Sequence, residues 1–391
     1  MEKFYLYLFV CVLSLSACNN KGSQEHKAGS KISKSATDTL LPVYFYKRLE
    51  GTIGDMPVVV HLKRAGDEWE GMYYYQRYGK WMELLFEKDS SRNGRYCFQE
   101  FSPVEINTTN HPQQNFLYLY YRSGTFTGTW KGSEGKKNFP VNLQERYPKG
   151  SYPFTPAAYL DAVAAFPQEP KSPEAKVNYY YLMADGNTTE SKWLNKQLRL
   201  QLNLITPDTA KSWTAELRQQ AVNYFRDYRE EASQFAEEKQ LPTFLNYESS
   251  SKADIKYNAN HYVIVEQMTY EYSGGAHGNW GSKLLVMDVQ QKRILSLQDV
   301  VHASARQLQP LVEKAFRSQY KLADTDSLNT ILFENQLLPN QNFYFTSQGV
   351  GFIYNPYEVA AYVMGQIFVF IPYTELNNYL DPEFKRRMNI P

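Results

Sequence analysis

The strongest constraint on the fold is a run of short β-type segments between residues 43 and 146. Each is rich in aromatic and β-branched residues, and turn signals such as Gly54-Asp55 and Ser123-Gly124 separate them. Strands at this spacing, with no helix of useful length between them, indicate an antiparallel meander, a sandwich or a small barrel. The expected strands are Val43–Leu49, Pro57–Arg64, Glu68–Arg77, Lys80–Glu87, Arg95–Phe101, Asn115–Arg122, Thr125–Lys131 and Phe139–Gln144.

Composition agrees with a globular, β-rich protein of more than one domain. The chain has 391 residues, of which 43% are hydrophobic, and 32 are tyrosines, which favour strands. Lys plus Arg number 42 and Asp plus Glu 41, so no basic excess points to nucleic acid as a partner. Three cysteines are too few for a disulfide scaffold.

The first residues, MEKFYLYLFVCVLSLSAC, predict an export signal that ends at a lipidation site. Lys3 precedes an apolar run from Phe4 to Leu15, which is too short to span a bilayer as a permanent helix. The small residues before Cys18 are similar to the bacterial lipobox. We therefore expect residues 1–17 to be a removed signal peptide and Cys18 to be acylated; the alternative is an ordinary secretory signal that contains a cysteine.

Several acyl chains on Cys18 would anchor the protein to a membrane without spanning it. No later segment offers the roughly 18 consecutive apolar residues of a second anchor. Residues 18–42 are polar and rich in lysine, which predicts a solvated tether. Asn19, rather than Asp, follows the cysteine, and this favours a lipid-anchored location in the cell envelope at the outer membrane.

Residues 147–175 are rich in proline and predict a linker that contains one helix, Ala157–Phe166, with Thr155 as its cap. Residues 176–391 predict a second domain. Leucines at every second position predict a half-buried strand over Trp193–Ile205, and 3.6-residue spacing predicts a long helix over residues 212–239. Further strands are expected at His261–Tyr272, Lys283–Asp288, Arg293–Leu297, Phe343–Thr346, Gly351–Tyr354 and Gln366–Ile371, and helices at Leu308–Tyr320 (with Pro310 in its first turn), Ser327–Glu334 and Tyr373–Leu380.

The expected fold class is therefore α+β: an all-β antiparallel meander or small barrel over residues 43–146, then an α+β domain with an antiparallel sheet and two long helices.

Two segments of the second domain resemble a known family. They are YEYSGGAHGNW (residues 270–280) and YNPYEVAAYVMGQIFVFIPY (residues 354–373). Together they are similar to the extracytoplasmic domain of RsiV-type, lysozyme-sensing anti-sigma factors, which also occurs beside peptidoglycan deacetylases and in bacterial lipoproteins. The resemblance covers roughly residues 176–385. It implies an α+β binding domain that is not an enzyme, and in the anti-sigma relatives this domain binds lysozyme. The chain shows neither their transmembrane helix nor their sigma-binding segment, so we do not expect the signalling role.

The residues of these two motifs are the candidate ligand-binding site. Gly274 and Gly275 permit positive φ, so a sharp turn is expected from which His277 and Asn279 project. The alternative is a turn whose polar side chains bond nearby backbone. Glu358 either caps a short helical segment or pairs with a base. The full candidate set is Tyr272, Gly274, Gly275, His277, Asn279, Tyr354, Asn355, Tyr357 and Glu358.

No catalytic or metal-binding pattern is found. The histidines are His26, His61, His111, His261, His277 and His302, and no two lie within five residues, so an HExxH zinc site is excluded. There is also no GxSxG elbow, phosphate loop or GxGxxG motif. Cys97 lies between aromatic residues and is expected to be a core residue. We expect no cofactor.

The function expected from these observations is non-catalytic binding at the cell envelope. The partner would be a lysozyme-like protein or a peptidoglycan fragment, since aromatic faces pack on sugars and anchor protein interfaces. Two alternatives stay open. One is an envelope hydrolase or amidase with an unrecognised site, and the other is a lipid or sugar bound within the N-terminal β-domain.

Overall fold

The structure is a computed structural model that describes residues 40–89, 91, 94–104, 114–133, 135, 137–204, 212–238 and 241–391. Residues Thr37–Pro391 form one compact unit. The expected signal peptide, Cys18 and the tether as far as residue 39 lie outside the described residues. Within the described ranges, no helix is both long and apolar enough to cross a membrane.

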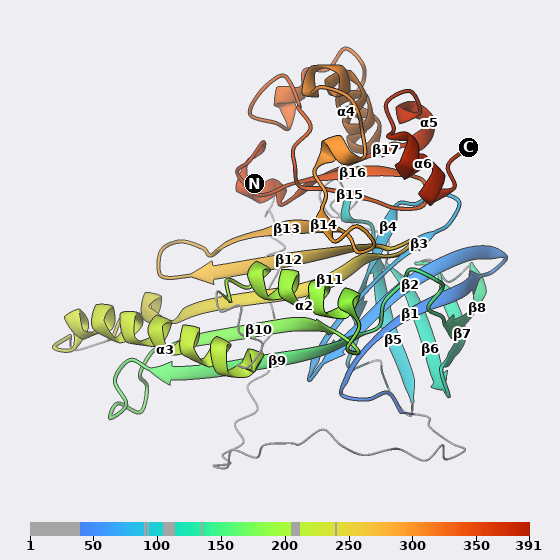
Figure 1. Ribbon diagram of the computed structural model, residues 1–391. Helices are drawn as coiled ribbons and strands as arrows, with labels where there is room; N and C mark the ends of the chain where they lie inside the picture. The colour runs from blue at the N-terminus through green and yellow to red at the C-terminus, as the bar shows by residue number, and fades with distance from the viewer. Residues whose placement is uncertain are drawn as a thin grey trace. The chain divides into compact units, whose positions relative to one another are not determined.

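Residues 44–145 form a closed antiparallel barrel in which each strand pairs with the next and the last returns to the first (Figure 1). Every strand expected in this region is present, which confirms the all-β prediction and selects the barrel among its three forms. The strands are β1 (Tyr44–Ile53), β2 (Met56–Ala65), β3 (Glu68–Tyr75), β4 (Trp81–Phe86), β5 (Arg95–Phe101), β6 (Asn115–Arg122), β7 (Thr125–Lys131) and β8 (Asn138–Glu145).

The barrel interior is filled by side chains. Leu49, Tyr73, Phe98, Leu117 and Phe126 are all fully buried and belong to one apolar cluster. Small barrels of this kind have an interior just wide enough for their own side chains. A ligand enclosed within the barrel, as one alternative above supposed, would therefore have to displace the core.

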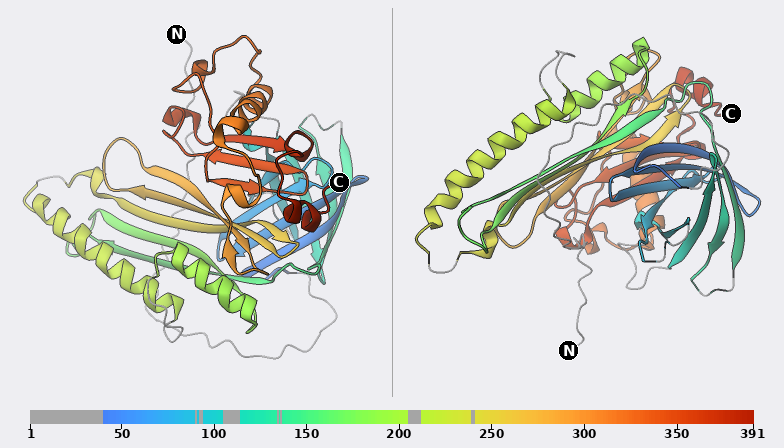
Figure 2. Two further views of the ribbon diagram at one scale, coloured as in Figure 1. Left: turned by 45° about the horizontal axis from the view of Figure 1, so that its top comes forward. Right: turned by 90° about the horizontal axis from the view of Figure 1, so that it is seen from below.

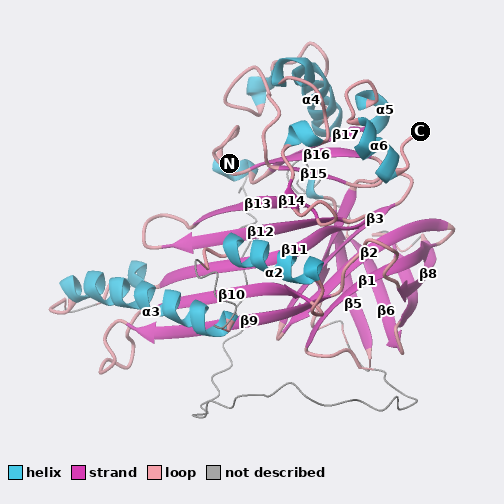
Figure 3. Ribbon diagram, in the orientation of Figure 1, coloured by secondary structure: helices cyan, strands magenta, loops and turns pink. Residues whose placement is uncertain are grey.

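A second sheet follows the barrel, with the strand order β14-β13-β12-β11-β10-β9 (Figure 3). All its pairs are antiparallel except β10 with β11. Between those parallel strands the chain forms the helices α2 (Thr189–Gln201) and α3 (Trp213–Ala232). The strands are β9 (Phe154–Ala164), β10 (Glu174–Ala184), β11 (Tyr247–Ala259), β12 (Tyr262–Tyr272), β13 (Asn279–Asp288) and β14 (Arg293–Ile294).

Two expectations in this region are wrong. Ala157–Phe166 is not a helix, because residues as far as Ala164 pair with β10 as strand β9. Pro156 is tolerated there because β9 is at the edge of the sheet. The strand expected at Trp193–Ile205 is mainly helix α2, capped by Thr188, with Leu194 and Leu198 buried and Leu200 exposed. A four-residue leucine spacing is also a helical pattern, and packing decides between the two readings.

Both helices cover one face of the second sheet (Figure 2). The expected apolar face of α3 is confirmed: Ala221, Phe225, Tyr228 and Ala232 are buried against the β9–β11 region. The helix ends at Ala232, and one 3₁₀ turn, Ser233–Phe235, follows.

The opposite face carries the C-terminal lobe, the name used here for residues 305–388. Its strands β15 (Phe343–Phe345), β16 (Gly349–Tyr354) and β17 (Ile367–Pro372) form an antiparallel sheet. Its helices are α4 (Ala305–Tyr320), α5 (Tyr373–Leu376) and α6 (Pro382–Met388).

Three expectations in the lobe need correction. Helix α4 begins at Ala305, where Ser304 and Gln307 form a capping box, so Pro310 lies in the second turn. The helix expected at Ser327–Glu334 is only a 3₁₀ turn, Leu328–Thr330. The expected last helix, Tyr373–Leu380, is only the four-residue α5, Tyr373–Leu376, and a further helix, α6, begins beyond it at Pro382.

The barrel meets the second sheet through a buried polar junction. Lys63 pairs with Asp254, and Lys256 Nζ lies 2.8 Å from Glu266. Beside them Tyr46 Oη lies 2.8 Å from Nδ1 of His61, whose side chain is 3% exposed. Burial, and then the nearby cations Arg48 and Lys256, lowers the pKa of His61 well below its ordinary value.

The neutral state of His61 predicts a loss of stability in acid. In the unfolded chain this imidazole binds a proton below about pH 6.5, whereas the folded protein excludes that proton until a lower pH. The free-energy advantage of native protein over His61→Asn should therefore shrink by about 1.4 kcal/mol between pH 7.5 and pH 5.5. Denaturant unfolding of both proteins at the two pH values measures it. An advantage that is the same at both values would contradict the assignment.

Candidate functional site

The two sequence motifs meet at one surface point. His277 comes from the loop after β12, and Tyr357 and Tyr362 from the segment between β16 and β17. The ring centres of His277 and Tyr362 lie 4.1 Å apart with planes at 24°. The centre of the Tyr357 ring lies 5.4 Å from that of Tyr362 and 6.3 Å from that of His277. These three rings are called the aromatic cluster below.

Glycines shape the loop that presents His277. Gly274 and Gly275 have φ of +93° and +99°, so the sharp turn expected there is present. Tyr272 Oη donates to the carbonyl of Gly275 at 3.0 Å and closes the turn. A Cβ at Gly278 would lie 2.5 Å from the Tyr270 ring, so only glycine fits without a shift.

Hydrogen bonds to backbone fix the cluster. Tyr362 Oη donates to the Gly278 carbonyl at 2.8 Å, and Nδ1 of His277 lies 3.0 Å from the same oxygen. Nε2 of His277 lies 3.3 Å from Tyr357 Oη. His277 thus bonds nearby backbone, as the structural alternative expected, and also joins an exposed aromatic surface.

Tyr357 is exposed, with 54% of its surface accessible. Its φ is +67°, in the left-handed region that a bulky residue rarely adopts. Such strain persists only where surrounding contacts hold it and is often found at binding sites. Val363, the residue that follows Tyr362 in the sequence, is 72% exposed.

Three of the candidate residues form the framework beneath this surface. Tyr354 is buried, and its Oη donates to the Leu338 carbonyl at 2.7 Å. Glu358 accepts from the Asn355 backbone N–H at 2.8 Å and from Asn340 Nδ2 at 2.8 Å, so it caps the turn as one alternative expected.

Asn355 joins the lobe to the edge of β13. Its Oδ1 accepts from the Ser282 N–H at 2.8 Å, and its Nδ2 donates to the Ser282 carbonyl at 3.1 Å. Asn342 makes a similar pair of bonds further along β13. Its Oδ1 accepts from the Leu284 N–H at 2.8 Å, and its Nδ2 donates to the Ser282 carbonyl at 3.0 Å. Two asparagine side chains therefore occupy the hydrogen-bonding positions of a neighbouring strand.

Among the remaining candidates, Asn279 is exposed at the start of β13 opposite Glu271, outside the aromatic cluster. Sequence reasoning missed Tyr362 as a site residue and Asn342 as a framework residue. Tyr362 lies inside the second quoted motif, so its aromatic character there was an available signal. Asn342 lies outside both motifs, and only the tertiary structure reveals its role.

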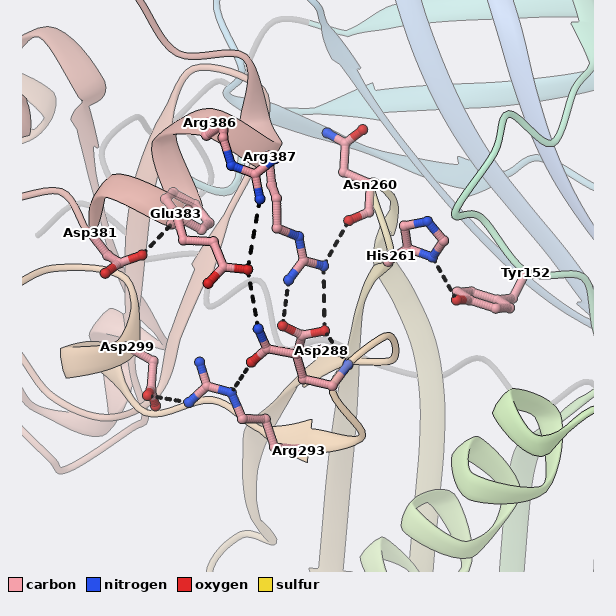
Figure 4. A network of polar contacts seen from close by, with 12 residues as sticks. Tyr152, Asn260, His261, Asp288, Arg293, Asp299, Asp381, Glu383, Arg386 and Arg387 are labelled. Atoms are coloured by element: carbon pink, nitrogen blue, oxygen red, sulfur yellow. Dashed lines mark hydrogen bonds and ion pairs between the residues drawn. The ribbon is translucent and has the colours of Figure 1, made fainter.

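A second polar network, around Arg387, connects helix α6 to the second sheet (Figure 4). Arg387 Nη1 lies 2.5 Å from Asp288 Oδ2, and Nη2 donates to the Asn260 carbonyl at 3.1 Å. The guanidinium carbon lies 4.0 Å from the centre of the Tyr262 ring. Asp288 is 1% exposed. With these donors and acceptors engaged, the network holds α6 on β12 and β13.

The chemistry available at the aromatic cluster is recognition by stacking and hydrogen bonding. Flat apolar faces suit a sugar ring or the aromatic and aliphatic side chains of a protein. Within the described ranges, no group of three His, Cys, Asp or Glu residues is placed to hold a metal ion.

Comparisons with known proteins match two successive parts of the chain that follow the barrel. The family model described as Deacetylase PdaC matches residues 169–280. The family model described as a protein of unknown function (DUF3298) matches residues 298–374. His277 lies in the first match and Tyr357 and Tyr362 in the second, so the aromatic cluster spans both. No curated protein matches the chain.

Two solved structures are similar to this chain. A DUF3298 family member from Bacteroides fragilis is 19% identical, with a TM-score of 0.55 over 61% of this chain and 98% of its own. A DUF3298 family protein from Pseudomonas aeruginosa is 22% identical, with a TM-score of 0.41 over 60% of this chain and 96% of its own. The similarity to the Bacteroides fragilis structure supports the fold described above.

The edge-capping role of Asn355 predicts a stability loss on substitution. Asn355→Ala leaves the N–H and carbonyl of Ser282 with fewer partners and should lower the unfolding free energy by about 2 kcal/mol. Asn279→Ala, which truncates the exposed asparagine of the first motif, should change the unfolding free energy by less than about 0.5 kcal/mol. Denaturant unfolding measures both, and equal effects would rule out the capping role.

The polar network at Arg387 predicts a larger loss of unfolding free energy on substitution. Arg387→Met leaves the carboxylate of Asp288 buried without its cation and should cost about 3–5 kcal/mol. The matched control is Arg386→Met, one residue earlier on the exposed face, which should cost less than about 1 kcal/mol. If the two variants unfold at the same denaturant concentration, Arg387 is not the anchor of α6.

Proposed function

We propose that this chain is a non-catalytic binding protein of the cell envelope, with a second domain of the RsiV type. The proposed partner is a lysozyme-like protein or a peptidoglycan-derived glycan, held on the aromatic cluster. One observation carries the proposal: two motifs about 80 residues apart build a rigid, exposed group of aromatic rings. In the same proposal, lipidation at Cys18 anchors the protein at the outer membrane.

The geometry supports recognition by preorganised rings. The side chains of His277 and Tyr362 are fixed to the backbone of Gly278, so little rotamer entropy is lost when a partner binds. Tyrosine is enriched among interface residues with large energetic effects, and its ring also stacks on sugars. The half-exposed Tyr357 has the surface available for such a contact.

The PdaC match favours a second candidate, an envelope hydrolase or deacetylase. Catalysis of that kind commonly uses a metal held by several side chains, or an activated nucleophile. The residues near the aromatic cluster supply one imidazole, that of His277, and the neighbouring carboxylate of Glu358 is engaged in capping. Binding is therefore the better-supported function.

The proposal predicts that Tyr357 dominates the affinity. Tyr357→Asn removes the ring while an asparagine tolerates the left-handed backbone, and we expect at least a thirtyfold loss of affinity, about 2 kcal/mol. The control is Tyr120→Asn, because Tyr120 is 50% exposed on the barrel. Titration calorimetry with lysozyme and with purified muropeptides measures both proteins.

The outcomes separate the candidates. Binding of one partner that Tyr357→Asn weakens and Tyr120→Asn does not supports the proposal and names the partner class. Equal affinities of native protein and Tyr357→Asn would remove the aromatic cluster from the site. Release of acetate or peptide from peptidoglycan, detected by mass spectrometry, would establish the enzymatic candidate instead.

A further inference from the structure

The barrel has a pocket at one open end, remote in sequence from the aromatic cluster. Its volume is about 420 Å³, within the roughly 300–1,000 Å³ range of small-molecule sites. It lies where the turns β2–β3 and β4–β5 meet. The side chains that matter to its chemistry are Arg64, Trp69, Phe86, Lys88, Arg95 and Tyr96.

One wall of the pocket is aromatic. The rings of Trp69 and Phe86 are stacked with centres 4.4 Å apart and planes at 15°. The ring centre of Tyr96 lies 5.5 Å from that of Trp69. Beneath this wall Phe98 is fully buried in the barrel core, 5.8 Å from Trp69. Trp69 and Tyr96 are themselves buried, at 7% and 9% exposed, and Phe86 is the more accessible ring of the wall. Because packed side chains lie behind these rings, the pocket does not continue into the barrel.

The other chemical feature of the pocket is positive charge. The Arg64 guanidinium lies 5.0 Å from the centre of the Trp69 ring, and its Nε donates to the Gly66 carbonyl at 2.8 Å. These contacts orient the guanidinium beside the aromatic wall and leave its terminal amino groups without an ion pair among the described residues. Lys88 is exposed, and Arg95 adds a third cation.

The acidic residues of the pocket do not cancel this charge. Asp67 and Glu68 also line it, but Glu68 pairs with Lys252 of strand β11 at 3.2 Å. Among the described lining residues, Arg64 and Lys88 therefore outnumber the one remaining carboxylate, that of Asp67. Arginine in a fixed orientation is well suited to phosphate and carboxylate oxygens, which it binds through two N–H groups at once.

We infer that this end of the barrel binds an anionic amphiphile. The phosphate or carboxylate group is held by Arg64 and Lys88, and the apolar body lies on the Trp69–Phe86 wall. The same chemistry occurs in a membrane lipid headgroup and in a soluble acyl or alkyl anion. The site is independent of the aromatic cluster and of the proposed function.

The test uses octyl phosphate as the probe and the whole chain carrying Cys18→Ser, so that no acyl group is attached. Titration calorimetry should detect binding that weakens with salt, and inorganic phosphate should bind at least tenfold more weakly because it lacks the apolar body. The double variant Arg64→Gln/Lys88→Gln should lose at least tenfold in affinity for octyl phosphate. Its control is Arg77→Gln/Lys131→Gln at the opposite end of the barrel, which should bind like the parent.

A second arm identifies the source of the ligand. Flotation with phosphatidylglycerol vesicles but not with phosphatidylcholine vesicles, abolished by Arg64→Gln/Lys88→Gln, assigns the pocket to a lipid headgroup. Octyl phosphate binding without flotation assigns it to a soluble amphiphile. No octyl phosphate binding, or equal binding by parent and Arg64→Gln/Lys88→Gln, overturns the inference. Tyr357→Asn should leave octyl phosphate binding unchanged, which keeps this test separate from that of the aromatic cluster.

Discussion

Strand β12 sends successive side chains into two different cores, and the remaining elements are arranged around that requirement. Val263 and Val265 pack with Leu194 and Leu198 of α2 on one face of the sheet. Tyr262 and Ile264 belong to the other core, with the lobe. Because alternate residues of a strand point to opposite faces, the continuous apolar run 262–265 at the start of β12 must be covered on both sides. The helices and the lobe provide these two covers.

The barrel contributes to the second of these cores and is not an independent attachment. Val59, Met72, Tyr74 and Trp81 face outward from the barrel into the same apolar cluster as the lobe. Trp81 stacks on Tyr344 of β15 with ring centres 3.9 Å apart. The barrel, the sheet and the lobe therefore share buried surface, and apolar area buried between them stabilises all three together. The aromatic cluster gains its rigidity from this arrangement, since its two segments belong to two elements of a common core.

Local patterns predicted the barrel strands and helix α3 well, because short turns and periodic apolar positions are properties of neighbouring residues. Closure of the barrel depends on the antiparallel pairing of β1 with β8, in which Leu49 lies opposite Glu145. No local sequence pattern encodes a pairing between residues so far apart in the chain. The same limit explains the two wrong expectations in the second sheet. Ala157–Ala164 has helical composition but pairs with β10, and the leucines around Leu198 satisfy both a helical and a strand period. At the candidate site, both motif residues His277 and Tyr357 were predicted from the sequence, and the structure brings their rings together. The framework roles of Asn355 and Glu358 depend on hydrogen bonds that the sequence does not encode locally.

The asparagine caps on β13 have a consequence for biosynthesis. Asn342 and Asn355 are translated after the strand whose edge they satisfy, so the β12–β13 hairpin exists for some time with the N–H groups of Ser282 and Leu284 unpaired. An unpaired strand edge is a template for pairing with another chain. The C-terminal lobe therefore protects the edge of β13 from aggregation. A chain interrupted before Asn342 would expose unpaired N–H and C=O groups of β13 that can pair with another chain.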